Sequence, residues 1–224
     1  MIVNKKIFIV IPAHNEAQVI GSVIEGIIKN GYKNIIVVDD GSSDNTEAVA
    51  KEHGALVVRH MINRGKGASA KTGIEAAKLL NADVVVTIDG DGQHNPEDIK
   101  KLLKKLDRHD LVLGYRLHPE SKMPKTRIIG NLFANFFTWI IYGLWVKDSQ
   151  SGFRAYSEKT LNEINLNYDK YEFDSEIIRE IVKNKIKYVE IPIEVRYTKY
   201  SMNKQSRQTL VKGIKTIIRL FLLT

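Results

Sequence analysis

Residues 84–94 read Val-Val-Val-Thr-Ile-Asp-Gly-Asp-Gly-Gln-His, an apolar run that ends in a cluster of polar residues. The run has the length and the β-branched composition of a buried strand. Asp89 and Asp91 follow it directly, and two carboxylates separated by one small residue can both face one hard divalent cation. Because Asp-Gly pairs are also common in turns, this triplet alone does not distinguish a metal site from a turn.

The same succession of a strand and a polar cluster recurs in the first half of the chain. Further short apolar runs lie near residues 7–13, 34–38, 55–58 and 111–113, with helical patterns between them near 17–29, 44–53, 67–80 and 96–107. Strands that alternate with helices of this length predict an α/β fold of the Rossmann type, a mostly parallel sheet flanked by helices. Polar clusters at 12–16, 39–44 and 89–94 each follow a strand, so we expect one binding site beyond the carboxyl ends of the strands.

The composition is that of one folded domain, with 224 residues of which 43% are apolar and 27% charged. Cysteine is absent, which excludes disulfides, thiolate metal sites and cysteine nucleophiles. The net charge is +8, and residues 195–224 hold seven basic residues and no acidic one, which leaves +1 for residues 1–194. Such a basic segment attracts phosphates in general, whether of a nucleotide, a nucleic acid or an anionic lipid surface.

A glycine-rich basic loop, Asn63-Arg64-Gly65-Lys66-Gly67, precedes the third long helical pattern. A loop of this kind suits a diphosphate, because backbone N–H groups at a helix N-terminus favour anions. The sequence contains no Gly-x-x-x-x-Gly-Lys-Ser/Thr, and no Gly-x-Gly-x-x-Gly follows the first strand. These two absences argue against a P-loop nucleotidase and against a dinucleotide-dependent dehydrogenase.

The second half contains an uncharged stretch, residues 128–146, bounded by Arg127 and Lys147. One stripe of polar side chains runs through it at helical spacing: Asn131, Asn135, Thr138 and Tyr142. We interpret the stretch as an amphipathic helix lying in the membrane interface, with basic anchors at both ends. The alternatives are a helix packed on the sheet, a dimer face, or, by length alone, a membrane span.

The C-terminal segment, residues 201–224, shows a second amphipathic pattern. Apolar residues alternate with Lys212, Lys215 and Arg219 at helical spacing. A basic amphipathic helix is suited to an anionic membrane surface. A terminal helix docked on the domain, with a solvated basic face, would give the same pattern.

The ordered set of these motifs, with Asp-Ser-Gln-Ser-Gly-Phe-Arg at residues 148–154 downstream, resembles the GT-A-fold glycosyltransferases of family 2. Within them it most resembles the polyprenyl-phosphate sugar synthases, such as dolichyl-phosphate mannose or glucose synthases, over residues 5–200. That resemblance implies inverting transfer of a sugar from a nucleotide diphosphate donor to a lipid phosphate. It also implies a GT-A domain at 1–200 with a nucleotide-sugar half (1–114) and an acceptor half (115–200), peripheral on the cytoplasmic face of the membrane.

The resemblance assigns roles residue by residue on the donor side. The nucleoside pocket would be lined by Pro12, Asn15, Glu16, Asp39 and Asp40. The divalent ion, Mg²⁺ or Mn²⁺, would be held by Asp89 and Asp91, with Gln93 as a third ligand. Lys66 of the basic loop, Arg196, and a basic residue of the following loop such as Lys204 would bind the phosphates.

On the acceptor side, the resemblance makes Arg116 and Arg127 candidates for binding the lipid phosphate. Asp148 and the 151–154 run match the acceptor-side signature of the family. A lipid phosphate is already an anion near neutral pH, so the reaction can proceed without a general base. If a base is used, Asp148 and Asp174 are the candidates.

Several readings stay open at the level of sequence. The loop at 196–204 lacks the Gly-x-Ser-Lys of mannosyl relatives, which leaves both GDP- and UDP-sugars as donors. A family 2 enzyme with a polysaccharide or soluble acceptor is the nearest rival, although the Gln-x-x-Arg-Trp motif of processive synthases is missing after Gln150. A second alternative is a non-enzymatic basic module that binds membranes or nucleic acid. We expect no nucleic-acid partner, because the predicted acidic rim would repel nucleic-acid phosphates.

Overall fold

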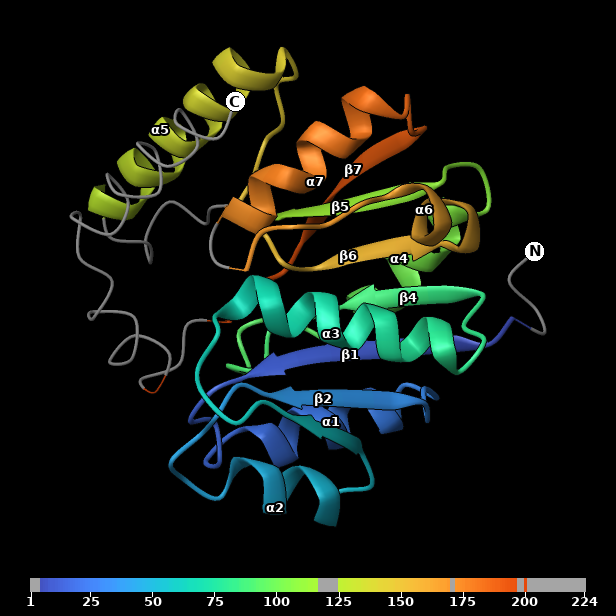
Figure 1. Ribbon diagram of the computed structural model, residues 1–224, viewed down its shortest axis with the longest axis vertical. Coiled ribbons are helices and arrows are strands. Elements are labelled where there is room, and N and C mark those ends of the chain that lie inside the picture. Colours follow the sequence, from blue (N-terminus) through green and yellow to red (C-terminus); the bar gives the residue numbers. More distant parts are fainter. Residues whose placement is uncertain (1–4, 117–124, 170–171, 197–199, 201–224) are drawn as a thin grey trace.

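The computed structural model describes residues 5–116, 125–169, 172–196 and 200, with the backbone alone at 125–131, 133, 134 and 172. Within these residues one seven-stranded sheet runs through the protein in the order β3-β2-β1-β4-β6-β5-β7 (Figure 1). The strands are β1 (Ile7–Ala13), β2 (Ile35–Asp39), β3 (Leu56–Arg59), β4 (Val84–Thr87), β5 (Leu111–Arg116), β6 (Arg154–Ser157) and β7 (Tyr188–Ile193). The predicted basic segment 201–224, with Lys204, lies outside the described residues.

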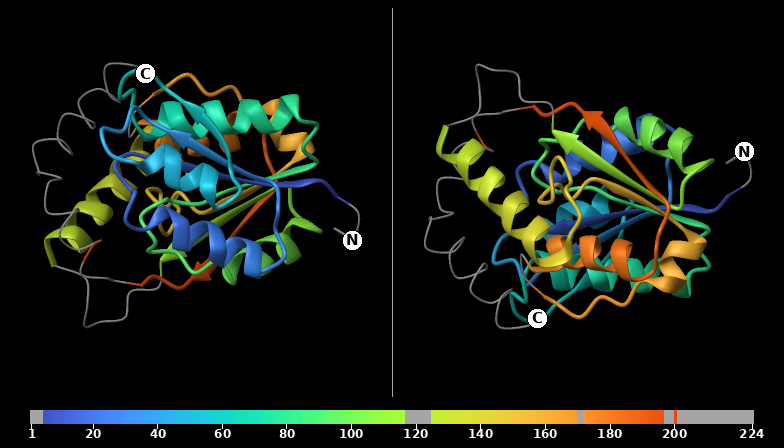
Figure 2. Two further views of the ribbon diagram at one scale, coloured as in Figure 1. Left: turned by 90° about the horizontal axis from the view of Figure 1, so that it is seen from below. Right: turned by 90° about the horizontal axis from the view of Figure 1, so that it is seen from above.

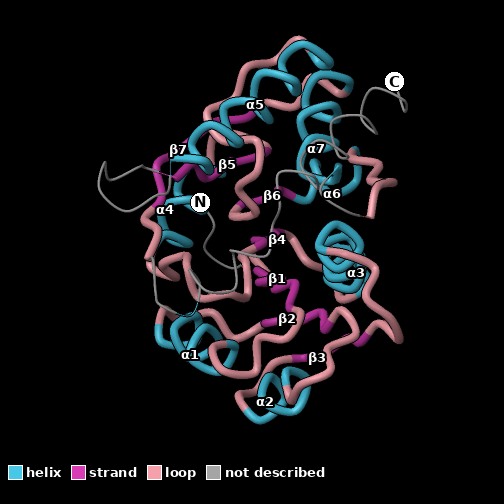
Figure 3. The backbone as a smooth tube through the Cα atoms, turned by 90° about the vertical axis from the view of Figure 1, so that its left-hand side faces the viewer, coloured by secondary structure: helices cyan, strands magenta, loops and turns pink. Residues whose placement is uncertain are grey.

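Helices cover both faces of the sheet, as the end-on tube of Figure 3 and the two views of Figure 2 show. The helices are α1 (Ile20–Lys29), α2 (Thr46–Glu52), α3 (Lys66–Leu79), α4 (Asp98–Leu106), α5 (Lys125–Tyr142), α6 (Glu158–Glu163) and α7 (Glu172–Lys183). One core lies between the sheet and α1, α2 and α4, and a second between the sheet and α3, α6 and α7. The predicted α/β architecture is confirmed, with strands and helices of the first half close to their expected positions.

Strand β1 shows why the sheet is buried on both faces. Ile9 and Ile11 point into the core with α1, whereas Phe8 and Val10 point into the core with α3, because successive side chains of a strand alternate. All four are buried, so the strand is continuously apolar. Such runs are typical of parallel strands covered by helices on both sides.

The strand β6 is the one exception to parallel pairing among the described strands. It lies between β4 and β5 and runs antiparallel to both. Arg154 at its start is therefore level with Thr87 at the end of β4 and with Leu113 of β5. As a result, the residues just before β6 lie at the same sheet edge as the polar clusters that follow the parallel strands.

The predicted amphipathic helix is present as α5, which extends from the domain (Figure 1), but its polar stripe faces the protein. Asn135 and Thr138 are 4% and 1% exposed. Asn135 donates to the Lys147 carbonyl at 2.8 Å and accepts from the Ser149 amide at 2.9 Å. The helix thus docks through polar contacts and leaves apolar side chains outside. In the part of the chain that the structure describes, no helix is both long and apolar enough to span a bilayer.

Candidate active site

The polar clusters meet at the carboxyl ends of β1 and β4, where the strand order reverses. From β1 the chain proceeds to β2 and β3 on one side, and β4 lies on the other. Open α/β sheets bind ligands in the crevice at such a point. The two turns lie in contact here, since a Cβ built on Gly90 would come within 3.0 Å of the Pro12 carbonyl oxygen. Predicted donor-side residues on β1 and β4 are thereby neighbours.

Asn15 and Glu16 join the turn after β1 to the loop after β2. Asn15 has a φ of 55°, and its side-chain oxygen accepts from the Ser43 amide at 2.9 Å. Its own amide donates to Ser42 Oγ at 2.9 Å. Glu16 accepts a hydrogen bond from the hydroxyl of Tyr200 at 2.9 Å. Tyr200, which the sequence did not single out, brings a residue of the C-terminal region onto the predicted nucleoside pocket.

Asp39 ends β2 as a fully buried carboxylate. Its Oδ1 accepts from the Ser42 amide at 3.0 Å, and its Oδ2 lies 3.7 Å from Nε of Arg59. This Oδ2 has no hydrogen-bond partner among the described residues. A buried acceptor of this kind is costly unless a donor reaches it. The predicted role of Asp39 in binding a nucleoside would supply such a donor.

Asp40 holds the basic loop rather than facing open space. Its Oδ1 accepts from His60 Nδ1 at 2.8 Å and from the Arg64 amide at 3.0 Å, and its Oδ2 accepts from the Gly65 amide at 2.8 Å. Burial opposes the charge, but these hydrogen bonds hold the pKa of Asp40 below its ordinary value. Asp40 therefore holds the backbone of the loop that precedes Lys66. His60 was missed by the sequence reasoning, although it directly follows β3.

Lys66 and Asp89 form an ion pair at the centre of the site. Lys66 begins α3, and its Nζ lies 2.8 Å from Asp89 Oδ1. The other oxygen, Oδ2, lies 3.3 Å from Nε2 of the buried His94. Although burial raises it, these two partners hold the pKa of Asp89 far below its ordinary value. Gly152 adjoins the pair, because a Cβ on it would come within 2.5 Å of Asp89 Oδ1.

Asp91 and Gln93 continue the turn after β4. Asp91 Oδ1 accepts from the Gln93 amide at 3.0 Å, and burial together with the nearby Asp89 raises the pKa of Asp91. The Gln93 side chain is buried, and its Nε2 has no partner among the described residues. The described residues hold no group of three or more His, Asp or Glu side chains arranged for a metal. Mg²⁺ commonly takes one or two carboxylates and completes its shell with water and substrate phosphates, so the pair Asp89 and Asp91 fits such an ion.

Arg116 and Asp148, two of the predicted acceptor-side residues, form a bidentate ion pair. The guanidinium, at the end of β5, donates from Nε to Asp148 Oδ2 at 2.7 Å and from Nη2 to Oδ1 at 2.9 Å. The Arg116 amide also donates to Oδ2, at 3.2 Å. Burial opposes the charge, yet Arg116 lowers the pKa of Asp148. Both carboxylate oxygens are engaged, which favours a role in orienting Arg116 over a role as a base.

Arg154 and Asp174 form a second, deeper ion pair. Arg154 Nη2 lies 3.0 Å from Asp174 Oδ1, and both side chains are buried. Burial raises the pKa of Asp174, while Lys66 and Arg154 oppose that rise. Asp174, in the first turn of α7, also contributes to the raised pKa of Lys66. The charges of Arg154 and Asp174 thus act on Lys66 and, through it, lie next to Asp89.

The chain returns to the site after β7. Val195 pairs with His94 in an isolated antiparallel bridge, and the Arg196 amide donates to the Gln93 carbonyl at 2.7 Å. The structure therefore places Arg196 at the turn that carries Asp91. Arg127 lies in the first turn of α5, with only its backbone described.

A mostly parallel sheet with an Asp-x-Asp turn at its switch point and a basic loop beside it is the arrangement of a GT-A glycosyltransferase. The comparisons agree: the chain belongs to glycosyl transferase family 2, whose family model matches residues 8–164. It is therefore a glycosyltransferase, as its sequence motifs predicted.

The chain is similar in sequence to two named relatives and in fold to one solved structure. The chain is 36% identical to UDP-N-acetylglucosamine--dolichyl-phosphate N-acetylglucosaminyltransferase of Methanococcus voltae, over 98% of this chain and 96% of that one. It is 28% identical to polyprenol monophosphomannose synthase of Mycolicibacterium smegmatis, over 91% and 82%. Glucosyl-3-phosphoglycerate synthase of Mycobacterium tuberculosis, solved with Mn²⁺, UDP and phosphoglyceric acid, has the same fold, with a TM-score of 0.68 at 22% identity over 96% and 80%.

Proposed function

We propose that this protein transfers a sugar, with inversion, from a nucleotide diphosphate sugar to a polyprenyl phosphate at a membrane surface, with a divalent cation. The observation that carries the proposal is the centre formed by Asp89, Asp91 and Lys66. It offers two carboxylates for a metal ion in the turn after β4, and the Lys66 ammonium for a diphosphate lies 2.8 Å from the first of them. The names of the two relatives, a dolichyl-phosphate N-acetylglucosaminyltransferase and a polyprenol monophosphomannose synthase, support the acceptor class.

The donor we propose is a UDP-sugar. The 36% identical relative is named for a UDP-sugar donor, and the similarity covers nearly the full length of both chains. The polyprenol monophosphomannose synthase, at 28% identity, is more distant. The loop at 196–204 also lacks the Gly-x-Ser-Lys of mannosyl relatives.

The proposed transfer requires positive charge at two places, the donor diphosphate and the acceptor phosphate. Negative charge develops on the donor diphosphate as the bond between sugar and phosphate breaks. We assign its stabilisation to Lys66, whose Nζ lies beside Asp89, and to Arg196, whose backbone amide binds the Gln93 carbonyl. A bound divalent cation would be held by Asp89 and Asp91 and would add Lewis-acid stabilisation of the same charge. The acceptor phosphate is an anion and attacks without prior deprotonation, so its main requirement is orientation. Arg116, fixed by Asp148, supplies that orientation.

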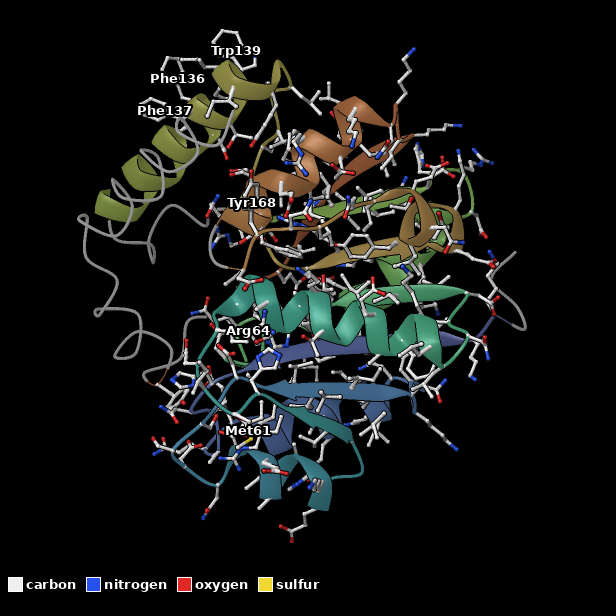
Figure 4. All side chains as sticks on the ribbon, viewed as in Figure 1. Met61, Arg64, Phe136, Phe137, Trp139 and Tyr168 are labelled. Carbon is white, nitrogen blue, oxygen red and sulfur yellow. The ribbon has the colours of Figure 1, made fainter. Side chains whose placement is uncertain are left out.

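The surface that would meet the membrane is the outer face of α5, here called the aromatic face: Leu132, Phe136, Trp139, Ile140 and, beyond the helix, Trp145. Each of these side chains is between 43% and 54% exposed. Figure 4 shows Phe136 and Trp139 on the side of α5 that points away from the sheet. The rings of Trp139 and Trp145 lie 6.3 Å apart. Aromatic side chains favour the bilayer interface, and a lipid acceptor makes the cytoplasmic membrane surface the natural occupant of this face.

The first test is calorimetric titration of the protein with UDP and with GDP, each with and without Mn²⁺. We expect UDP to bind only weakly alone and tightly with Mn²⁺, and GDP to bind weakly in both cases. Asp91→Asn should lose the Mn²⁺-dependent part while its thermal unfolding stays cooperative. Binding of neither nucleotide, or full activity of Asp91→Asn, would contradict the donor-site proposal.

The second test is transfer from labelled UDP-sugars to a short polyprenyl phosphate in detergent, compared with transfer to soluble phosphorylated and glycan acceptors. We expect product only with the polyprenyl phosphate. Transfer to a soluble acceptor alone would favour the other family 2 reading, in which the aromatic face has a different occupant.

A further inference from the structure

We propose that Lys66 is a resident counter-ion of Asp89 that moves to the donor diphosphate when a divalent cation binds, so that metal and nucleotide bind with positive cooperativity. This inference rests on the donor site proposed above and goes beyond it, because it assigns Lys66 two successive partners. The starting observation is that the ammonium already lies on the carboxylate predicted to hold the metal.

Both oxygens of Asp89 are engaged by the protein itself. Lys66 Nζ lies 2.8 Å from Oδ1, and His94 Nε2 lies 3.3 Å from Oδ2. The shorter contact is an ion pair between side chains that are 29% and 26% exposed, so it is accessible to ions from solvent. A cation that coordinates Oδ1 must therefore displace Lys66 or share the oxygen with it.

Sharing the oxygen is unfavourable for two reasons. An ammonium and a divalent ion on one carboxylate repel each other strongly in a partly buried site. There is also little room, since a Cβ on Gly152 would come within 2.5 Å of Asp89 Oδ1 and 2.7 Å of Lys66 Nζ. Lys66 has to leave Oδ1, and the diphosphate is an anion of the right charge to receive it.

The position of Lys66 allows such a movement. It is the first residue of α3, where the helix N-terminus faces the same edge of the sheet as Asp89. The residue before it, Gly65, has a φ of 108° and is held by Asp40, so the backbone of the loop is fixed while the lysine side chain remains long and rotatable. Lys66 can thus change partner without a change of fold.

The effect of Lys66 on metal affinity should therefore depend on the nucleotide, which is not expected of a lysine that only binds phosphate. In the absence of nucleotide, Lys66 competes with the metal. In its presence, Lys66 binds the diphosphate and stops competing. Removal of the lysine should therefore strengthen binding of the metal alone and weaken the effect of the nucleotide on that binding, and by reciprocity the effect of the metal on the nucleotide.

The experiment is titration of the full chain with Mn²⁺, followed by the electron paramagnetic resonance signal of free Mn²⁺, with and without saturating UDP. The variants are Lys66→Met and Lys66→Gln, which are both neutral, and the control is Lys71→Met. Lys71 lies on the same helix but faces Asp169 at 3.8 Å, so the control removes the same charge away from Asp89. Thermal unfolding identifies which neutral variant is folded.

We expect Lys66→Met or Lys66→Gln to bind Mn²⁺ alone about tenfold more tightly than the wild type, and UDP to tighten that binding by a smaller factor. Lys71→Met should behave like the wild type. If the neutral variants bind Mn²⁺ alone equally or more weakly, the inference is wrong while the donor site stands. If the wild type binds neither Mn²⁺ nor UDP, the proposed function itself fails and the inference fails with it.

Discussion

Gly152 and Asp89 are packed so closely that a Cβ atom on the glycine would come within 2.5 Å of the Asp89 Oδ1 oxygen. The two residues are distant in sequence and meet because β6 runs antiparallel to β4. Thr87, near the end of β4, accordingly donates from Oγ1 to the Gly152 carbonyl at 2.7 Å. The acceptor-side signature and the predicted metal turn are thus one structural unit.

Gly152→Ala should therefore damage the site more than the fold. The added methyl group would displace Asp89 Oδ1 or Lys66 Nζ, both within 2.7 Å of it. A displacement of about 1 Å in a reacting centre can lower a rate by about 100-fold. We expect a loss of transfer of roughly that size, together with weaker Mn²⁺-dependent UDP binding, measured by product formation and calorimetry.

Gly54→Ala is the matched control. Gly54 has a φ of 86°, but nothing lies within 4 Å of a Cβ placed on it. Alanine in that conformation costs about 1 kcal/mol of stability. This variant should unfold more easily yet transfer sugar normally. Full activity of Gly152→Ala would contradict this prediction, because Asp89 and Lys66 would then have room to accommodate the added methyl group.

The architecture could be predicted from the sequence because short buried strands alternate regularly with helices in the first half of the chain. Buried strands such as Val84–Thr87 and helices of about three turns leave few alternatives to a parallel sheet. The rule that ligands bind at the carboxyl ends then places Asp89 and Glu16 at one edge. The order of strands and helices along the chain is enough to predict both the sheet and the edge that carries the site.

The pairing of individual side chains could not be predicted in the same way. The ion pair of Lys66 with Asp89, and the capture of Asp40 by the loop amides, depend on where loops from different strands end in space. The direction of the polar stripe on α5 was also undetermined. Its period shows that Asn135 and Thr138 share a face, but only the contacts with Lys147 and Ser149 show that this face is inside.

The pair of Arg116 and Asp148 should make stability depend on pH. Because the folded-state pKa of Asp148 lies below its ordinary value of about 3.9, the pair adds stability above that pH. That stability is lost as the pH falls through the lower folded-state value. Asp148→Asn should therefore cost about 2 kcal/mol in urea unfolding near neutral pH, and the gap to the wild type should narrow in acid.

Asp110→Asn provides a surface comparison for that measurement. Asp110 lies 3.1 Å from the exposed Lys159, and exposed pairs contribute about 0–1 kcal/mol. Asp110→Asn should therefore lower the free energy of unfolding only slightly at every pH. A gap between Asp148→Asn and the wild type that is the same in acid and at neutrality would mean that the charge of Asp148 does not stabilise the fold.

The aromatic face should be needed for membrane binding but not for folding. Phe136→Ser with Trp139→Ser removes two half-exposed rings, which lie 6.0 Å apart on α5. We expect about a tenfold or larger loss of binding to vesicles that contain anionic lipid, since each buried ring contributes a few kcal/mol at most. Vesicle co-sedimentation measures it, with thermal unfolding as the check on folding.

Leu79→Ser tests whether that loss is specific. Leu79 is 83% exposed and ends α3, so it is an exposed apolar side chain outside the aromatic face. It should leave vesicle binding unchanged. Should the double variant dissociate an oligomer instead of leaving the vesicles, the aromatic face would be an interface between copies of the chain.

Tyr200 should strengthen nucleotide binding through its contact with the turn after β1. Its hydroxyl oxygen lies 2.9 Å from Glu16 Oε2 and 3.0 Å from the Asn15 carbonyl oxygen, and its one proton is shared between these two acceptors of the turn. Burial and the neighbouring Glu16 raise the pKa of Tyr200, so the hydroxyl keeps its proton at neutral pH. A hydrogen bond to a charged group contributes about 1.5–3 kcal/mol, part of which would be felt in binding. We expect Tyr200→Phe to raise the Kd for UDP with Mn²⁺ about five- to tenfold.

A double-mutant cycle with Glu16→Gln separates this contact from a general effect on the pocket. If the hydrogen bond carries the effect, the two substitutions together should cost clearly less than the sum of the single costs, because each removes the same interaction. Additive costs would assign the effect of Tyr200 to some other contact. Tighter UDP binding in Tyr200→Phe would contradict the prediction, because the Tyr200 hydroxyl would then oppose nucleotide binding rather than support it.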